Sequence, residues 1–213
     1  MESDSEPFEG RRPSEYDRLA GVYDRRWRRY VESTNRRAFN WLAEGEWNVF
    51  LDVGCGTGYL LSHVADRFPD RDLYGVDASR AMLAVAGNRC RGRERITLVE
   101  AEASRLPFAD GRFDRIASLS ALHCFPDPEA ALAECRRVLH GSGSMLVIDW
   151  NADTIPMRTM VAWLRLSKRA VNWVYPSLQL REILRDTGFD VQRMERFRVP
   201  PLWSLTAFWC RVA

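Results

Sequence analysis

The sequence predicts an α/β fold with a doubly wound, mostly parallel β-sheet. From residue 47 to residue 150, short apolar runs typical of strands alternate with capped or amphipathic stretches typical of helices. A loop with three glycines separates the first apolar run from the helix that follows it. Alternating strands and helices form βα units, and such units place their strands parallel in one sheet.

Five strands are expected in this part of the chain. Each is a short, mainly apolar run bounded by polar or glycine-containing segments. They fall at 48–53, 72–77, 95–100, 113–119 and 144–149. Two later runs, at 189–198 and 205–212, have the same character and would complete a seven-stranded sheet.

Each expected helix between these strands begins or ends at a recognisable residue. The first covers 59–68 and stops before Pro69, which cannot continue a helix. The second begins after Ser79, a residue type that caps helix N-termini. The third covers 127–140, because Asp-Pro is a common helix start and Gly141 a common helix end.

A helical cap of residues 15–46 is expected before the sheet, after a mobile polar tail at 1–14. Apolar residues between Tyr16 and Leu42 recur every three or four positions, which is the spacing of one helix face. The pattern predicts one helix, or two helices broken near 33–34.

The alternation of strands and helices lapses at 151–180. A helix-like stretch at 157–175 lies between two prolines, and a short helix is expected at 177–187. We interpret 151–180 as a lid insert over the site, within a main domain of residues 47–213.

Composition indicates a globular protein without special partners. Hydrophobic residues make up 46% and charged residues 28% of the 213 residues, which excludes wholesale disorder. The formal net charge of +2 gives no case for nucleic acid. The five cysteines form no Cys-x-x-Cys pair, so we expect no metal, no disulfide framework and a reducing compartment. No apolar run reaches 18 residues and the acidic amino end is unlike a signal peptide, so a cytoplasmic protein is expected.

The positive charge is concentrated near the amino end. Residues 10–43 hold nine arginines and four acidic residues, a local net charge of +5. Four of these arginines, Arg25, Arg26, Arg28 and Arg29, flank Trp27. A basic amphipathic helix can lie on an anionic membrane surface, so a peripheral membrane contact is one interpretation. A solvated helix face is the simpler one.

The glycine loop indicates a nucleotide-type ligand. Gly54, Gly56 and Gly58 follow a strand and precede a helix, where glycine lets the backbone turn tightly and approach a ligand. Asp77 ends the next strand. Because adjacent parallel strands bind ligands at their carboxyl ends, the Asp77 carboxylate is suited to a ribose diol.

The spacing argues against a dinucleotide. The dinucleotide fingerprint Gly-x-Gly-x-x-Gly would require glycine at position 59, where the chain has Tyr59. No lysine follows the loop, as a P-loop would require. The expected ligand is therefore an adenosine without a pyrophosphate.

Four ordered segments resemble the motifs of class I S-adenosylmethionine-dependent methyltransferases, in the branch typified by the ubiquinone/menaquinone C-methyltransferases. They are 51–60, 75–79 with Met82, 102–114 and 121–128. Tyr16-Asp17 and Tyr23-Asp24 are similar to the paired aromatic-Asp elements that close over the cofactor in this family. The resemblance implies a Rossmann-like fold, S-adenosyl-L-methionine as cofactor and methyl transfer as the activity.

The resemblance also implies individual roles at the cofactor. It places the glycine loop at the methionine and ribose parts, with Asp52 supporting the loop and Asp77 at the ribose hydroxyls. It places Met82 on the adenine and the Leu119 backbone at the methionine amino group. Glu102 stands where the family usually has Asp. The full expected set is Tyr16, Tyr23, Asp52, Gly54, Cys55, Gly56, Thr57, Gly58, Asp77, Ala78, Met82, Glu102, Ala103 and Leu119.

His123 and Asp149 are the expected general-base pair. His123 follows the fourth strand and Asp149 ends the fifth, and the family's strand order makes these strands neighbours. A carboxylate beside an imidazole orients the ring and raises its basicity. Packing of the loop by His123 is the alternative. Cys124 is not expected to form a dyad with His123, because neighbours on a strand point to opposite faces.

Four tryptophans of the carboxyl third, with Trp27 of the cap, are expected to line an apolar substrate pocket: Trp150, Trp163, Trp173 and Trp203. Plain core is an equally good account of any one of them. The predicted function is methylation of a small, largely apolar molecule, with oxygen, carbon and nitrogen acceptors all open. Phospholipid N-methylation at a membrane surface remains an alternative. A catalytically silent protein that binds S-adenosylmethionine or S-adenosylhomocysteine is the rival from another class. The oligomeric state stays open.

Overall fold

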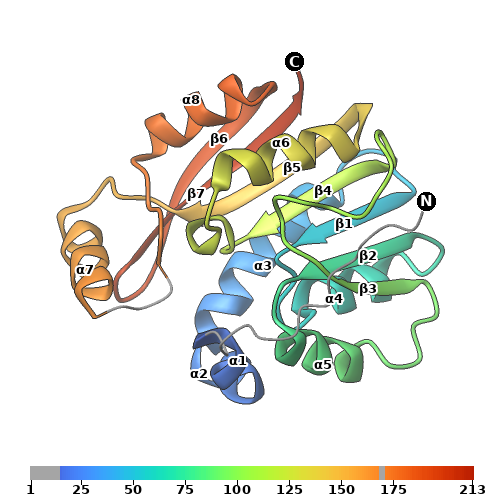
Figure 1. Ribbon diagram of the computed structural model, residues 1–213, viewed down its shortest axis with the longest axis horizontal. Coiled ribbons are helices and arrows are strands. Elements are labelled where there is room, and N and C mark those ends of the chain that lie inside the picture. The colour runs from blue at the N-terminus through green and yellow to red at the C-terminus, as the bar shows by residue number, and fades with distance from the viewer. Residues whose placement is uncertain (1–14, 168–170) are drawn as a thin grey trace, which may run out of the picture.

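The computed structural model describes residues 15–167 and 171–213. Seven strands form one sheet in the order β3-β2-β1-β4-β5-β7-β6 (Figure 1). The strands are β1 Val49–Val53, β2 Asp72–Asp77, β3 Ile96–Glu100, β4 Phe113–Leu119, β5 Leu139–Trp150, β6 Phe189–Val199 and β7 Trp203–Val212. The first five are parallel, and β7 is antiparallel to both β5 and β6. The predicted doubly wound, seven-stranded sheet is confirmed.

Helices cover both faces of the sheet (Figure 1). One face packs against α6 and α8 through a core that includes Leu132 and Leu184, and the other packs against α3 and α4 through Leu42 and Leu61. The helices are α1 Glu15–Leu19, α2 Tyr23–Arg26, α3 Arg28–Leu42, α4 Tyr59–Arg67, α5 Arg80–Arg89, α6 Pro128–Val138, α7 Ile155–Leu166 and α8 Ser177–Asp186. Burial of these apolar side chains is the main stabilising contribution to the fold.

The strand order reverses between β1 and β4. From β1 the chain builds outward through β2 and β3, and from β4 it builds in the other direction through β5. Ligands of such sheets bind at the carboxyl ends of the strands beside this reversal. The segments that follow β1, β2, β4 and β5 are therefore the ones that the fold places at a site.

Two predicted helix starts are confirmed in detail. The Ser79 hydroxyl accepts a hydrogen bond from the Met82 backbone N–H at 3.1 Å, at the start of α5. The Asp127 carboxylate accepts one from the Ala130 backbone N–H at 2.9 Å, and Pro128 is the first residue of α6. Both side chains satisfy backbone donors that the helix itself leaves free.

The predicted end of the helix at 127–140 was wrong. Helix α6 ends at Val138, and the chain passes directly into β5 at Leu139. Leu139 is buried and pairs with Phe113 of β4, so tertiary pairing overrides the local signal at Gly141. His140 consequently lies in a strand and not at a helix end.

The helical cap breaks earlier than predicted. Trp27, with φ −113° and ψ 22°, separates α2 from α3, and a 3₁₀ turn at Ala20–Val22 separates α1 from α2. No break occurs at 33–34, where α3 is continuous and the Thr34 hydroxyl donates to the Tyr30 carbonyl at 2.9 Å.

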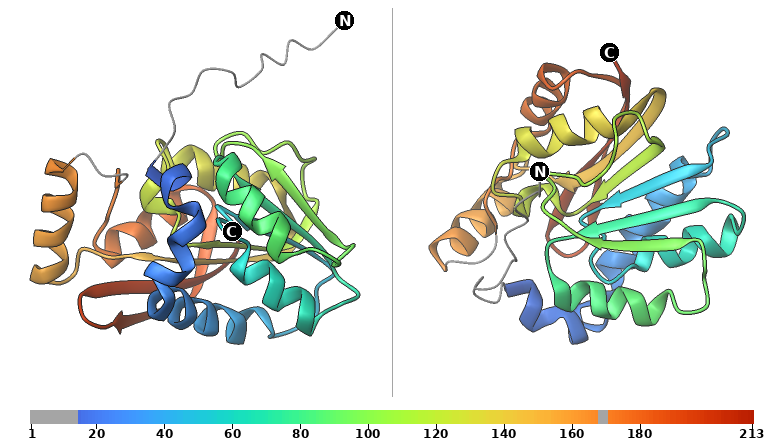
Figure 2. Two further views of the ribbon diagram at one scale, coloured as in Figure 1. Left: turned by 90° about the horizontal axis from the view of Figure 1, so that it is seen from below. Right: turned by 45° about the vertical axis from the view of Figure 1, so that its right-hand side comes forward.

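The insert after β5 is shorter in helix than predicted. Helix α7 ends at Leu166, and the described residues from 171 to 176 are irregular. In Figure 2, α7 stands away from the sheet, joined to it through its own small core of Met157, Val161 and Val171. The tail predicted at 1–14 lies outside the described residues.

Candidate functional site

Two pockets meet at the carboxyl ends of β1, β2, β4 and β5. The glycine-loop pocket, of about 370 Å³, lies over the loop after β1. The aromatic pocket, of about 660 Å³, lies between the helical cap and α7. Their common wall consists of Tyr16, Tyr23, Tyr30 and Ser120, which line both pockets.

The glycine loop is open toward its pocket. Gly54 and Gly56 have φ values of +76° and +53°, a region that L side chains rarely adopt. A Cβ at Gly54 would lie 2.4 Å from the Cβ of Ala121, whereas one at Gly56 would meet no atom within 4 Å. The loop thus leaves space for a ligand at Gly56, which fits the close approach that the sequence predicts.

Gly58 does not line the pocket, unlike the other residues expected at the cofactor. It precedes α4 with φ +70°, and a Cβ there would lie 3.0 Å from the Cβ of Ala86 in α5. The third glycine therefore allows two helices to pack closely and turns the chain into α4.

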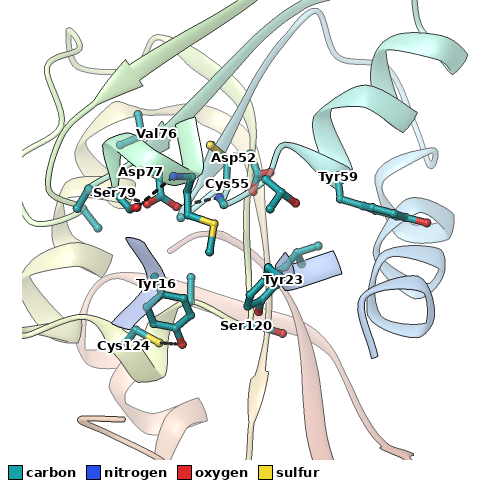
Figure 3. Close-up of a pocket in the computed structure, with 18 of the residues that line it drawn as sticks. Tyr16, Tyr23, Asp52, Cys55, Tyr59, Val76, Asp77, Ser79, Ser120 and Cys124 are labelled. Atoms are coloured by element: carbon teal, nitrogen blue, oxygen red, sulfur yellow. Dashed lines mark hydrogen bonds between the residues drawn. The ribbon is translucent and has the colours of Figure 1, made fainter. Parts of the chain in front are cut away.

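Two carboxyl groups lie beneath the loop, that of the buried Asp52 and that of the half-buried Asp77 (Figure 3). The Asp77 carboxylate accepts from the backbone N–H groups of Gly56 and Ser79, each at 2.8 Å. Burial raises the pKa of Asp77, although these two hydrogen bonds act in the opposite direction. Burial, reinforced by the charge of Asp77, raises the pKa of Asp52 to about 8. Asp52 thus carries a proton near neutral pH and can support the loop without a second full charge.

The helical cap is fastened to the loop by polar contacts. The Thr57 hydroxyl donates to Asp24 at 2.8 Å, and the same carboxylate forms an ion pair with Arg89. The Ser79 hydroxyl donates to Asp17. These contacts place the cap directly over the glycine-loop pocket.

Most predicted cofactor residues are brought together. Apart from Gly58, every one of them lines the glycine-loop pocket. Sequence reasoning missed others at the same wall, above all Tyr30, Ser79 and Ser120. Ser79 had a local signal, since it was recognised as a helix cap, but Tyr30 and Ser120 carry none.

His123 and Asp149 form a buried pair, as expected. The His123 Nδ1 lies 2.6 Å from one Asp149 carboxylate oxygen, and the His123 backbone N–H donates to the other at 3.1 Å. The imidazole stacks on Trp150, with ring centroids 4.2 Å apart. Asp149 holds Nδ1, and the Cys124 thiol is a further hydrogen-bond partner of the imidazole. Nε2 is the ring nitrogen that does not contact Asp149. His123 lines the aromatic pocket.

The reasoning that set Cys124 apart from His123 was wrong. Leu122–Cys124 form a 3₁₀ turn instead of a strand, so alternation of side chains does not apply. Burial lowers the pKa of His123, but Cys124 and Asp149 act more strongly and raise it above its ordinary value. The Cys124 thiol itself lies 2.9 Å from the Tyr16 hydroxyl and lines the glycine-loop pocket (Figure 3).

Four of the five tryptophans expected at the substrate line the aromatic pocket: Trp27, Trp150, Trp163 and Trp203. Trp173 lines neither pocket. Its indole N–H donates to the Pro126 carbonyl at 3.1 Å and its ring stacks on Tyr175, outside the pocket. Trp203 contacts Trp27 edge to face in this pocket, with ring centroids 5.6 Å apart.

Two kinds of feature were not found in the part of the chain that the structure describes. No cluster of three or more metal-ligating side chains occurs among residues 15–167 and 171–213. The helices within these ranges include none with the length and apolar character needed to cross a bilayer.

Residues 51–147 match the family model described as a methyltransferase domain. The chain is 34% identical over 128 residues to the demethylmenaquinone methyltransferase of Thermus thermophilus, covering 60% of this chain and 55% of that protein. It is 30% identical over 113 residues to the malonyl-[acyl-carrier protein] O-methyltransferase of Legionella pneumophila, covering 53% and 39%. The chain thus spans about half the length, or less, of these curated relatives.

A solved structure agrees in fold over nearly the whole chain. A Haloferax volcanii methyltransferase, in complex with the activator Trm112, superposes with a TM-score of 0.77 at 18% identity, covering 94% of this chain and 100% of that one. The chain therefore has the Rossmann-like fold of the solved methyltransferase structure, and residues 51–147 are similar to methyltransferase domains. Among the curated relatives, it resembles the demethylmenaquinone methyltransferases.

Proposed function

We propose that the chain transfers a methyl group from S-adenosylmethionine to a small, largely apolar molecule held in the aromatic pocket. The observation that carries this proposal is the shared wall of the two pockets, with the buried His123–Asp149 pair on the acceptor side. The two reactants would meet across Tyr16, Tyr23, Tyr30 and Ser120.

The glycine-loop pocket would hold the cofactor. When bound, S-adenosylmethionine supplies a methyl group on a sulfonium, which is open to in-line displacement. The Asp77 carboxylate is suited to its ribose hydroxyls, and the space at Gly56 is suited to the part of the cofactor that lies against the loop. Much of the barrier to such a displacement can be lowered by holding the reacting atoms in line and excluding water. The cap, fastened through Asp24 and Asp17, supplies that exclusion.

His123 would act as the general base for an acceptor that must lose a proton. Asp149 holds Nδ1, so Nε2 can take a proton from the acceptor while the carboxylate stabilises the imidazolium that forms. Stacking on Trp150 fixes the plane of the ring. Oxygen acceptors and acidic carbon acceptors need such a base, and the similar proteins include one named as a C-methyltransferase and one named as an O-methyltransferase.

The proposal is tested by S-adenosylhomocysteine release from the protein incubated with S-adenosylmethionine and a metabolite extract. Saturable release that is lost in His123→Gln, with cofactor binding intact, supports it. Full turnover by His123→Gln would remove the base assignment. Saturable cofactor binding without turnover on any extract would favour the rival, a protein that binds the cofactor without catalysis.

A peripheral membrane contact is a second proposal about the same pocket. Arg25, Arg26, Arg28 and Arg29 are exposed, and Arg26 reaches the aromatic pocket. Trp163 is 59% exposed on α7 at the same pocket. Basic and aromatic residues together favour an anionic lipid surface. Liposomes with anionic lipid should pellet the protein, the quadruple Arg→Ser variant should stay in solution, and no pelleting of the unmodified protein would remove the proposal.

A further inference from the structure

Ser120 has an unusual backbone conformation at the wall shared by the two pockets. Its φ of +54° is the only positive value for a residue other than glycine among residues 15–167 and 171–213. Its backbone N–H donates to the Ile148 carbonyl at 2.7 Å, which anchors the residue between β4 and β5. Strained conformations of this kind persist where the surrounding structure enforces them, and they cluster at functional sites.

The Ser120 hydroxyl ends a chain of two hydrogen bonds with a fixed direction. The Trp150 indole N–H donates to the Tyr30 hydroxyl oxygen at 2.8 Å, and the Tyr30 hydroxyl donates to the Ser120 Oγ at 2.5 Å. An indole N–H can only donate, so the Tyr30 oxygen is the acceptor in the first bond. The Tyr30 proton is then directed at Ser120.

Tyr30 is held in its neutral, donating form. Its side chain is buried, and burial raises the pKa of the phenol well above its ordinary value. The Ser120 oxygen therefore accepts from Tyr30, and the Ser120 proton must point elsewhere. Within the described part of the chain, no acceptor is recorded for that proton, and Ser120 lines both pockets.

The aromatic pocket is lined by both polar and apolar side chains. Tyr30, Ser120 and His123 line this pocket together, Arg26 and Thr159 are further polar residues of its lining, and most of the other lining side chains are apolar, such as Leu19, Met160 and Leu202. A largely apolar ligand finds partners for its polar atoms only where such groups converge.

We propose that the Ser120 hydroxyl donates a hydrogen bond to an oxygen atom of the methyl acceptor, with Tyr30 and Trp150 as positioning residues. This inference rests on the proposed function and adds a chemical requirement to the acceptor: an oxygen at or beside the atom that is methylated. The donor and the His123 imidazole would then contact the same end of the acceptor. A donor at that oxygen stabilises negative charge as His123 removes a proton.

The test compares two probes of similar size, 1-naphthol and 1-methylnaphthalene, of which only the first offers an oxygen. Equilibrium dialysis against protein saturated with S-adenosylhomocysteine gives both affinities, and it is repeated without the nucleotide. The unmodified protein should prefer 1-naphthol. Ser120→Ala should weaken 1-naphthol binding about 3- to 10-fold and leave 1-methylnaphthalene unchanged, as expected for one net hydrogen bond.

Matched variants separate the donor from simple packing. Tyr30→Phe keeps the ring but lets the Ser120 proton turn away, so it should lose part of the preference. Ser118, at the end of β4 and two residues before Ser120, has a buried hydroxyl and lines neither pocket. Ser118→Ala should therefore keep the full preference. In calorimetry, Ser120→Ala and the unmodified protein should bind S-adenosylhomocysteine with the same affinity.

Two results would overturn the inference. Unchanged 1-naphthol binding in Ser120→Ala, or an equal loss for both probes, would show that no donor faces the acceptor. A loss confined to S-adenosylhomocysteine binding in Ser120→Ala would assign the hydroxyl to the cofactor carboxylate instead. Failure of the proposed function is distinguishable, because it would appear as absent nucleotide binding or absent methyl transfer while the probe preference is still measured without nucleotide.

Discussion

Gly56→Ala should separate the cost of a left-handed backbone from the loss of a ligand. Gly56 has φ +53° with no atom within 4 Å of a built Cβ, and it lines the glycine-loop pocket. Gly92 has φ +82° and equally empty surroundings, but it lines neither pocket. Gly92→Ala is therefore a matched control that shares the backbone penalty and lacks the ligand.

The expected loss of stability is small and similar in both variants. An L side chain in the left-handed region costs roughly 1–2 kcal/mol, and the lower entropy of the unfolded chain returns about 0.4–1 kcal/mol. The net loss in unfolding free energy is then about 0–1.5 kcal/mol. For a chain of this size, each lost kcal/mol lowers Tm by about 2–4 °C. Urea unfolding without ligand measures the loss.

Calorimetric titration with S-adenosylhomocysteine should distinguish the two variants. Gly92→Ala should bind like the unmodified protein. Gly56→Ala should bind at least about tenfold more weakly, or ~1.4 kcal/mol, because its methyl group takes space that the ligand needs. Undiminished binding by Gly56→Ala would refute the placement of the cofactor against the loop, and a much larger loss of stability than in Gly92→Ala would show that the space is not open.

Two further predictions concern the aromatic pocket. The pKa of His123 is raised above its ordinary 6.5, so its base form is depleted near neutrality. Methyl transfer should rise with pH through a midpoint above 6.5 and Asp149→Asn should move that midpoint down, whereas a flat pH–rate profile would contradict a base role. Trp163→Ala should weaken 1-methylnaphthalene binding severalfold in equilibrium dialysis and Trp173→Ala should not, since only Trp163 lines the pocket. Equal losses would contradict that assignment.

Local sequence signals predicted local structure well. The caps at Ser79 and Asp127 need only their own neighbours, and the structure confirms both. The end of α6 was missed because Leu139 pairs with Phe113 of β4, a residue 26 positions away in the sequence. Gly141 carries a genuine stop signal, but the chain has already left the helix.

The cofactor side of the site was predictable from its motifs, and the wall between the pockets was not. The Tyr30–Ser120 and Trp150–Tyr30 hydrogen bonds join residues 90 and 120 positions apart. No spacing rule links such positions. The position of Trp173 could not be predicted for a related reason, because its partners Pro126 and Tyr175 are known only once the chain is folded.

The fastened cap has a kinetic consequence. Tyr16 and Tyr23 of the cap line both pockets, so one moving element covers the donor and the acceptor alike. If spent cofactor leaves beneath the cap, the contacts of Asp24 with Thr57 and Arg89 must first break. Opening of the cap would then set an upper limit on the turnover rate. Asp24→Glu keeps the carboxylate, so its rate of S-adenosylhomocysteine release in stopped flow should not exceed that of the unmodified protein. Faster release in Asp24→Asn, with unchanged chemistry in a single turnover, is the signature of that limit.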